Sequence, residues 1–495
     1  MAASFSEQSG SEFSEALSSA SWPGVEASSR QMSKRPLDAS LPVTLINAPM
    51  MAWPEDLSSA ASSTGFSLHA GCVVIQQGRI IDVSKTLPAS LLLNHDNVSI
   101  ITLPQNSILT PGLIDLQLNG AFGIDFNHAS LKQVTSLLWQ LPKYGITHAM
   151  ATLISAPLTD MLCALQLLEE AASIWPDISF LDEMPETLAS SEMLGIHLEG
   201  PFLNARFSGV HPLDALGAHS PCLTELKALL SPSVRMMTYA PERDVTGDML
   251  QCLLSAGVTP MAGHCNPDPE QLRAMVKTGL RGVTHLFNAM PPFHHRNAGC
   301  LPEILLNPDL YATWIGDGEH VCHEAMRLVQ AVKPNSRIAL VSDAMALAGR
   351  QSGETFDFAG QSVTRIGNRV VNAAGQLAGS VLLLNEMVAF LAKAGWMPFE
   401  QAVYQASAIA SDLIGESGRI GRIAPGLEAS LVVWQADCYD ILATWQRGEL
   451  AYHRDNSIAG LQTSQSTSET VSRQNPLDFF QVSRASEEAV LASIS

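Results

Sequence analysis

Short apolar runs alternate with amphipathic stretches along the middle of the chain, from residue 111 to residue 415. The stretches between the runs, such as residues 131–145 and 269–279, have helical patterns. Continuous apolar strands flanked by helices indicate a parallel sheet that is covered on both faces. Eight such units favour a closed (β/α)8 barrel over an open sheet. The candidate strands are residues 112–120, 148–156, 193–201, 234–242, 259–266, 282–290, 311–318 and 338–346.

Two shorter segments rich in strand-forming residues flank this α/β barrel. Residues 43–110 contain apolar runs that are separated by turns, and residues 76–80 are expected to turn a hairpin. Residues 416–455 contain a similar pattern. We expect the two segments to pair into one small β-sandwich domain, with the barrel inserted between its halves. Residues 1–42 and 456–495 are rich in Ser and poor in aliphatic runs, which predicts disordered extensions.

Composition disfavours several classes of protein. The chain has 495 residues, too many for one hydrophobic core, and 46% of them are hydrophobic. No run approaches the ~18 apolar residues of a membrane-spanning helix. The formal net charge of −20 disfavours binding to nucleic acid or to an anionic membrane surface. The eight cysteines show no CxxC pair and the first residues show no secretory pattern, so we expect reduced thiols in a cytoplasmic protein.

Four polar side chains each close one of the predicted barrel strands: Glu199, His264, His285 and Asp343. Because the carboxyl ends of barrel strands meet at one face, these side chains are expected to converge in a single pocket. Two imidazoles and a carboxylate suit zinc and leave a fourth position for water. Asp343 is then the candidate base for that water, with a helix N-cap as the alternative interpretation. The pattern therefore predicts a metal-dependent hydrolase.

These residues lie within motifs through which the chain resembles the N-acetylglucosamine-6-phosphate deacetylases of the amidohydrolase superfamily. The resemblance extends over residues 70–455, and the motifs HLEGP and THLFNAM together make it specific. The matching motifs are PGLIDLQLNG (111–120), HLEGPFLN (197–204), AGHCNP (262–267), THLFNAMPPF (284–293), GDGEHV (316–321), VSDAMALAG (341–349) and LAGS (377–380).

The resemblance implies roles for individual positions. Glu199, His264 and His285 match the metal ligands of the family. Asp343 matches its catalytic acid and base, and His320 matches a histidine that helps to polarise the acetyl carbonyl. The other positions that match substrate-binding residues are Val210, His211, Asn288, Ala289, Arg296, Ala378, Gly379 and Ser380.

Two of these matches concern the sugar phosphate directly. Arg296 matches an arginine that binds the phosphate, in some members across a dimer interface, and an arginine fork suits phosphate chemically. Residues 378–380 match a loop that closes over the sugar. The chain departs from the family pattern at residues 294–295, which are both His, at Asn297 and at Ser430. The departures bear on substrate preference more than on the chemistry.

The first predicted barrel strand reads Asp115-Leu-Gln117-Leu-Asn119. Many amidohydrolases carry Asp-x-His-x-His at this place and bind a second metal there. Because amides are poor zinc ligands, we expect one divalent metal ion per chain. Zinc is the first choice, and iron, manganese and cobalt are the alternatives.

The resemblance implies hydrolysis of N-acetyl-D-glucosamine 6-phosphate to D-glucosamine 6-phosphate and acetate, in amino-sugar catabolism, by a homodimer. Two alternatives stay open. One is another amidohydrolase that acts on a different N-acyl or cyclic amide. The other is a non-catalytic sensor of sugar phosphates.

Overall fold

The computed structural model describes residues 41–54, 65–86, 98–174, 188–216 and 222–454. The two predicted extensions lie outside the described residues, apart from the last two positions of the first one. Within the described ranges, no helix combines the length and the apolar character that crossing a bilayer requires. The predicted domain boundaries remain predictions, because the described parts of both flanking segments and of the barrel fall within one compact unit.

Eight parallel strands form a nearly closed barrel, which confirms the predicted fold class. The strands are β6 (Leu113–Leu118), β9 (Ile146–Ile154), β10 (Glu192–Glu199), β11 (Val234–Tyr239), β12 (Thr259–Ala262), β13 (Gly282–Val283), β14 (Tyr311–Ile315) and β15 (Ile338–Val341). Hydrogen-bonded neighbours follow the order β15-β14-β13-β12-β11-β10-β9-β6. The first and last strands meet just beyond β15, where the backbone N–H of Asp343 donates to Gln117 O at 2.9 Å.

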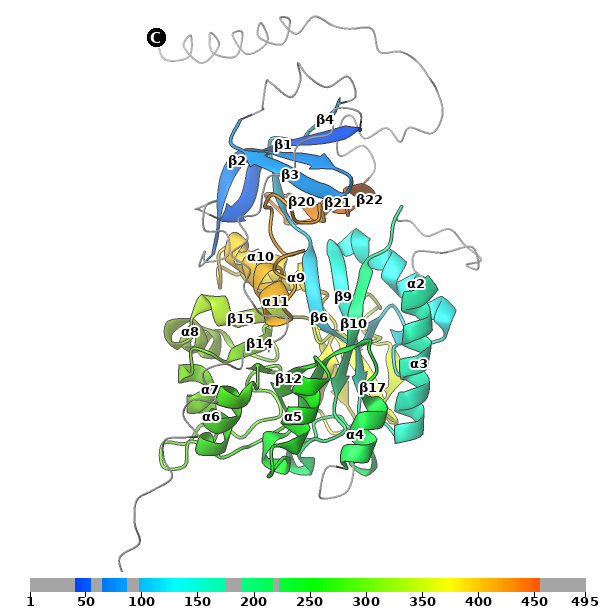
Figure 1. The fold of residues 1–495 in the computed structure, drawn as a ribbon, viewed down its shortest axis with the longest axis vertical. Coiled ribbons are helices and arrows are strands. Elements are labelled where there is room, and N and C mark those ends of the chain that lie inside the picture. Colours follow the sequence, from blue (N-terminus) through cyan, green and yellow to red (C-terminus); the bar gives the residue numbers. More distant parts are fainter. Residues whose placement is uncertain (1–40, 55–64, 87–97, 175–187, 217–221, 455–495) are drawn as a thin grey trace, which may run out of the picture. The chain divides into compact units, whose positions relative to one another are not determined.

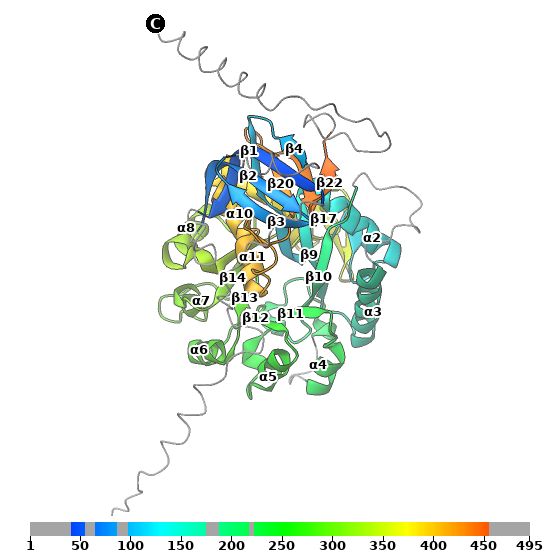
Figure 2. The ribbon, with the colours of Figure 1, turned by 45° about the horizontal axis from the view of Figure 1, so that its top comes forward.

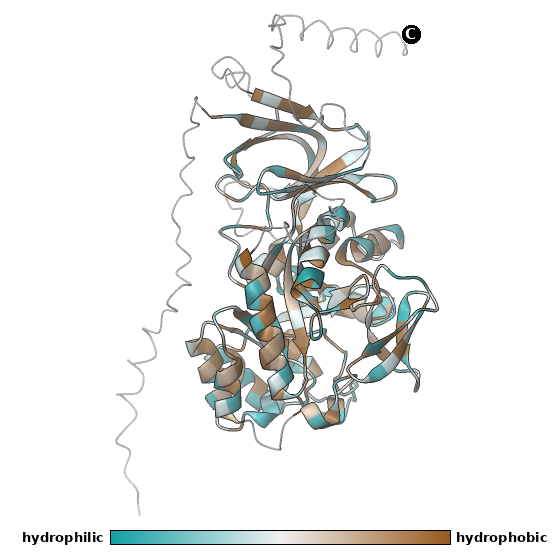
Figure 3. Ribbon diagram, turned by 90° about the vertical axis from the view of Figure 1, so that its right-hand side faces the viewer, coloured by the Kyte–Doolittle hydropathy of each residue, from teal (hydrophilic) through white to brown (hydrophobic). Residues whose placement is uncertain are grey.

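Helices between the strands surround the barrel in a ring (Figure 2). They are α2 (Leu131–Gln140), α3 (Leu158–Ile174), α4 (Leu223–Leu229), α5 (Asp248–Ser255), α6 (Pro269–Thr278), α7 (Leu301–Leu306) and α8 (His323–Val332). Local chemistry sets where some of them begin: Ser130 and Gln133 form a capping box at α2, and Asp268 caps α6. The helices carry both apolar and polar residues (Figure 3), so one side of each can pack on the strands while the other meets solvent.

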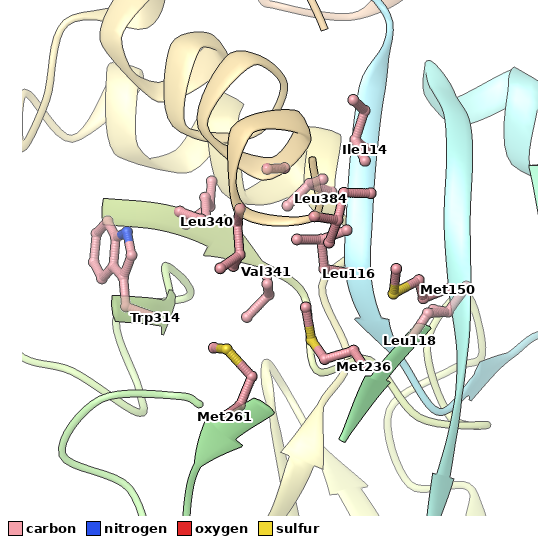
Figure 4. Packing of buried hydrophobic residues seen from close by; sticks show 14 of the residues in the cluster. Ile114, Leu116, Leu118, Met150, Met236, Met261, Trp314, Leu340, Val341 and Leu384 are labelled. Carbon is pink, nitrogen blue, oxygen red and sulfur yellow. The ribbon is translucent and has the colours of Figure 1, made fainter. Parts of the chain in front are cut away.

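The barrel core is mostly aliphatic. Leu116, Met236, Met261 and Leu340 come from four different strands and pack with Leu384, at the start of α9 (Leu384–Lys393) (Figure 4). Each of these side chains is at most 1% exposed. Burying one such side chain contributes ~1.5–3 kcal/mol. This packing fixes the strands whose carboxyl ends carry the polar residues.

Strands from both ends of the described chain form one sheet (Figure 1, blue and orange). They are β1 (Val43–Pro54), β2 (Phe66–Gln76), β3 (Arg79–Ser84), β4 (Val98–Thr102), β5 (Ser107–Pro111), β20 (Leu431–Gln435), β21 (Ile441–Gln446) and β22 (Glu449–His453). The hairpin predicted at residues 76–80 joins β2 to β3. The two segments connect where β5 pairs antiparallel with β20. The small β domain built from both flanking segments is therefore confirmed. Helices α10 (Phe399–Gln405) and α11 (Ala408–Leu413) precede its second segment.

A four-stranded antiparallel sheet follows the last barrel strand, and the sequence analysis did not predict it. Its strands are β16 (Thr355–Phe358), β17 (Gln361–Ile366), β18 (Arg369–Asn372) and β19 (Leu377–Ser380). The expected sugar-closing loop at residues 378–380 is therefore wrong as a description of local structure, because these residues form β19. They are held there by pairing with β18 and by Met345 N–H, which donates to Ser380 O at 3.1 Å.

Candidate functional site

The carboxyl ends of β10, β12 and β13 bring one carboxylate and two imidazoles together. Glu199 is the last residue of β10, and His264 and His285 each follow their strand by two residues. The Oε1 atom of Glu199 lies 3.0 Å from His264 Nε2 and 2.8 Å from His285 Nε2, and these two nitrogens lie 3.1 Å apart. All three side chains are at most 6% exposed. The structure therefore brings the three predicted metal ligands into one group.

Three strand-end residues have backbone conformations that non-glycine residues rarely adopt. The φ angle is +49° for His264, +33° for His285 and +48° for Asp343. Hydrogen bonds hold two of these turns: the backbone N–H of His285 donates to Thr313 Oγ1 at 2.8 Å, and that of Asp343 donates to Gln117 O at 2.9 Å. Strain of this kind costs ~1–3 kcal/mol per residue and is typical of functional sites.

The ring proton of His264 can be placed from its hydrogen bonds. Its Nδ1 lies 2.8 Å from the backbone oxygen of Phe207, which can only accept, so Nδ1 carries the proton. In the neutral ring, Nε2 then presents a lone pair to the Glu199 carboxylate oxygen at 3.0 Å. Two lone pairs at this distance repel each other unless a cation lies close to both. The donor set therefore fits a metal ion held by Glu199, His264 and His285, because metal ligands must present deprotonated atoms.

The charges in this group attract positive charge. Burial alone would raise the pKa of Glu199, but its contacts with the imidazoles of His264 and His285 outweigh burial and hold this pKa well below its usual range. Burial alone would lower the pKa of His285, but the hydrogen bond and charge of Glu199, helped by Asp343, outweigh burial and raise it. A buried anion that lies between two imidazoles is a suitable place for a divalent cation.

His211 also reaches this group, but its hydrogen bonds give it a different role. Its Nδ1 accepts the backbone N–H of Ser155 at 3.2 Å, so the ring proton lies on Nε2. That Nε2 lies 3.9 Å from Glu199 Oε1. Burial, helped by the charge of His264, lowers the pKa of His211 to about 3, so the ring is neutral near pH 7. Although Glu199, His211 and His264 are close enough to share a cation, the proton on Nε2 suits a hydrogen bond to a ligand better.

A cavity of about 220 Å³ opens over these residues and over Asp343. Six of the nine predicted substrate contacts line it: Val210, His211, Asn288, Ala289, His320 and Gly379. Ala378 and Ser380 are fully buried on either side of Gly379 in β19 and do not line the cavity. Arg296 is exposed and also lies outside the lining. No Lys or Arg of the described part of the chain lines the cavity, although an anionic substrate is expected there.

The sequence analysis missed the apolar side of this cavity. Ile154, Phe358 and Leu377 line it, and two of the three belong to the unpredicted sheet of β16 to β19. Ile154 and Phe358 also belong to a separate hydrophobic cluster that joins this sheet to the segment after Asp343. The inserted sheet therefore completes the wall of the site.

Two amides of the first barrel strand region, Gln117 and Asn119, donate to the acidic residues, and Asn119 also lines the cavity. Gln117 Nε2 donates to Glu199 Oε2 and to Asp343 Oδ1, both at 3.1 Å. Asn119 Nδ2 donates to Asp343 Oδ1 at 2.7 Å. The sequence analysis treated these amides only as poor metal ligands. Gln117 and Asn119 lie two residues apart in a strand-like run, so their side chains point to the same face. This spacing could have indicated that both reach the site.

A second histidine and acid group lies at the amino-terminal ends of β9 and β10. His148 Nε2 lies 3.6 Å from Glu192 Oε2 and 3.8 Å from Glu428 Oε2. Arg419 Nη1 lies 3.0 Å from Glu192 Oε2 and 3.2 Å from Glu428 Oε1. Arg447 also contacts both carboxylates. Because two guanidiniums already balance the two carboxylates, this group is an ion-pair network and a poor site for a cation.

Comparisons with known proteins agree with this geometry. The model of the amidohydrolase family matches residues 108–453. An N-acetylglucosamine-6-phosphate deacetylase of Bacillus subtilis is 30% identical over 386 residues, 77% of this chain and 93% of that protein. An N-acetylgalactosamine-6-phosphate deacetylase of Shewanella is 31% identical over 354 residues, 70% of this chain and 84% of that protein. The crystal structure of the N-acetylglucosamine-6-phosphate deacetylase from Pasteurella multocida matches with a TM-score of 0.70 at 26% identity, over 82% of this chain and 99% of that one. The chain therefore belongs to the amidohydrolase family and, within it, to the N-acetylglucosamine-6-phosphate deacetylases.

Proposed function

We propose that this protein hydrolyses N-acetyl-D-glucosamine 6-phosphate to D-glucosamine 6-phosphate and acetate in amino-sugar catabolism. One observation carries the proposal: Glu199 Oε1 contacts two imidazole nitrogens within 3.0 Å, and the same cavity is lined by the carboxylate of Asp343. This group fits one divalent metal ion per chain, and zinc suits a carboxylate and two imidazoles best. When bound, such an ion supplies an acidified water and polarises the acetyl oxygen.

Asp343 is placed to move the proton that the reaction requires. As acceptor, it takes a proton from water while the water oxygen attacks the acetyl carbon. As donor, it returns that proton to the sugar nitrogen while the C–N bond breaks, so that a neutral amine and acetic acid leave, and the acetic acid then loses its proton to solvent and becomes acetate. Burial, helped by the charge of Glu199, raises the pKa of Asp343 to about 6, which brings it closer to neutral pH than an ordinary carboxyl.

His320 is placed to stabilise the acetyl oxygen. Its Nδ1 lies 2.6 Å from Asp317 Oδ2. Burial alone would raise the pKa of Asp317, but the hydrogen bond with His320 outweighs burial and lowers it, so this acid stays anionic and holds the Nδ1 proton. The Nε2 atom is then left for the cavity that His320 lines. A proton on Nε2 would stabilise the negative charge that develops on the acetyl oxygen.

The phosphate needs a cationic side chain, and none of the described residues places a Lys or Arg in the cavity. Since no Lys or Arg of the described residues lines the cavity, we propose a homodimer in which Arg296 of the partner subunit binds the phosphate. The exposure of Arg296 on the segment after Asn288 and Ala289, which do line the cavity, supports this arrangement. Paired guanidinium hydrogen bonds suit a phosphate group.

Mixed dimers test the exchange of Arg296. Two variant proteins, Arg296→Ala and Asp343→Asn, are each expected to be weakly active alone. They would be mixed, unfolded and refolded together, so that some dimers contain one subunit of each kind and therefore one intact site. The proposal expects acetate release to recover to about a quarter of wild type, because half of the refolded dimers are mixed and each has one working site of two. No recovery, with mixed dimers shown by mass spectrometry, would mean that Arg296 serves its own subunit or none.

Substrate comparison tests the reaction itself. Acetate release would be measured with N-acetylglucosamine 6-phosphate, N-acetylgalactosamine 6-phosphate and unphosphorylated N-acetylglucosamine. The proposal expects the highest kcat/KM for the first sugar and a large loss without phosphate. The galactosamine sugar is the second candidate, because the Shewanella relative is as similar as the Bacillus one. Sugar phosphate binding without acetate release would support the sensor alternative and contradict the proposal.

We also propose that the protein works in the cytoplasm. All eight cysteines are free, and three of them, Cys72, Cys265 and Cys300, are buried. Unpaired buried thiols are typical of proteins from reducing compartments. Fractionation of the source cells, followed by detection of the chain, tests this location.

A further inference from the structure

The side-chain amide of Gln117 bridges the two acidic residues of the site. Its Nε2 donates to Glu199 Oε2 and to Asp343 Oδ1, each at 3.1 Å. The Oε1 atom of Glu199 faces the imidazoles, so Gln117 binds the oxygen that is not shared with them. One uncharged amino group therefore lies between two buried carboxylates that would otherwise repel each other.

The orientation of this amide follows from its neighbours. Amide oxygen and nitrogen are similar in shape, so their placement has to be argued from hydrogen bonds. Reversed, Gln117 would set its own oxygen 3.1 Å from Glu199 and from Asp343, and three acceptors would face one another. In the present orientation, its Oε1 is buried and has no donor among the described residues. A buried unpaired oxygen costs ~1–3 kcal/mol, so the bridge is kept despite a cost to stability.

Asp343 is held through one oxygen only. Its Oδ1 accepts Gln117 Nε2 at 3.1 Å and Asn119 Nδ2 at 2.7 Å. Within the described parts of the chain, no side chain donates to its Oδ2. The backbone reinforces the pairing, because Asp343 N–H donates to Gln117 O at 2.9 Å. The same residue of β6 therefore fixes both the main chain and the side chain of the acid.

We propose that Gln117 and Asn119 are positioning residues that hold Oδ1 of Asp343 and thereby assign Oδ2 as the oxygen that exchanges the proton with water and with the sugar nitrogen. The inference rests on the proposed deacetylase function. It goes beyond that function because it assigns the reacting oxygen of Asp343 and a positioning role to Gln117 and Asn119. Neither amide needs to touch the substrate or a metal ion for this task.

The test replaces Gln117 with Met, which has a similar length and no donor. The expected result is a fall in kcat of about 10- to 100-fold, part of the ~10²–10⁴ that general acid–base catalysis contributes, with KM within about twofold of wild type. In the Asp343→Asn background, Gln117→Met should cost nothing further, because the amide acts through Asp343. Because Gln117 also donates to Glu199, kcat is compared at a zinc concentration that saturates both proteins. Crystals of metal-free Gln117→Met should show the Asp343 carboxylate in more than one orientation.

A matched control separates positioning from folding. Gln405 is equally buried, accepts Trp314 Nε1 at 2.9 Å and donates to Asn335 Oδ1 at 3.0 Å, and it lies outside the cavity. Gln405→Met should lower stability and leave kcat unchanged. If Gln117→Met does not fold, Asn119→Leu is the second variant, with the same expected results.

If the wild type releases acetate, three results for Gln117→Met would overturn the inference. They are an unchanged kcat, a change in KM alone, or a loss of kcat that adds fully to the loss caused by Asp343→Asn. Absence of acetate release by the wild type itself would instead contradict the proposed function, so the two failures can be told apart.

Discussion

Replacement of Asp343 by Asn should remove the proton transfer and leave the fold intact. Asn has the shape of Asp, and its side-chain oxygen can take the Oδ1 position, where Gln117 and Asn119 donate at 3.1 and 2.7 Å. The new amino group then lies at the Oδ2 position, where it cannot accept a proton. The hydrogen bonds that hold the residue stay in place, so the loss is chemical.

The expected loss follows from the value of acid–base catalysis. Such a group contributes ~10²–10⁴-fold to the rate, which corresponds to about 2.7–5.4 kcal/mol of activation free energy at ~1.36 kcal/mol per tenfold. The assay is acetate release under saturating sugar phosphate, with metal content and urea unfolding measured on the same samples. Turnover near the wild-type rate, with full metal content and normal stability, would show that Asp343 does not transfer the proton.

The pH dependence of the wild type gives an independent check on the same residue. The ionised form of Asp343 accepts the first proton, so kcat/KM should fall as the pH drops through its pKa. Burial, helped by the charge of Glu199, raises this pKa to about 6. A bound divalent cation favours the anion and lowers it, so the acid limb should lie at or below about pH 6. In Asp343→Asn this limb should disappear.

Three further changes test the metal group, the core and the ion-pair network. His285→Asn should weaken metal binding by more than about 100-fold, since even outer-shell changes cost ~10–100-fold, and equilibrium dialysis measures it. Leu116→Ala should lower the free energy of unfolding by ~2–5 kcal/mol without changing metal content. Burial raises the pKa of Glu428, but His148 and two arginines outweigh it and lower this pKa to about 2. Glu428→Gln should therefore lower the free energy of unfolding, measured with urea at pH 7, by ~1–3 kcal/mol. The difference in unfolding free energy between wild type and variant should shrink as pH falls from 4.5 towards 2, because Glu428 becomes protonated in the folded protein.

Much of the barrel, and the convergence of Glu199, His264 and His285 at one end of it, could be predicted from the sequence. The strands in the eight apolar runs are mostly buried on both faces, so these runs contrast sharply with the helices around them. Glu199 and His264 stand out because a polar side chain interrupts an apolar run where the strand ends. That position is informative in a barrel, since it maps onto one face of the fold.

Other parts of the site could not be predicted, for physical reasons. The strands of the inserted sheet are short and partly exposed, so their apolar pattern is weak, and Phe358 and Leu377 were missed with them. The roles of Gln117 and His211 depend on hydrogen-bond direction across distant strands. Sequence spacing carries no information on which ring nitrogen of His211 accepts a hydrogen bond, or on which oxygen of an acid accepts the hydrogen bond of an amide.

We propose that one divalent cation, held by Glu199, His264 and His285, makes this chain a deacetylase. The most direct test is to titrate the metal-free protein with zinc and to follow acetate release from N-acetylglucosamine 6-phosphate. The account predicts no release without metal and a linear rise that ends at one zinc per chain. Full activity of the metal-free chain, or a rise that continues to two ions per chain, would contradict it.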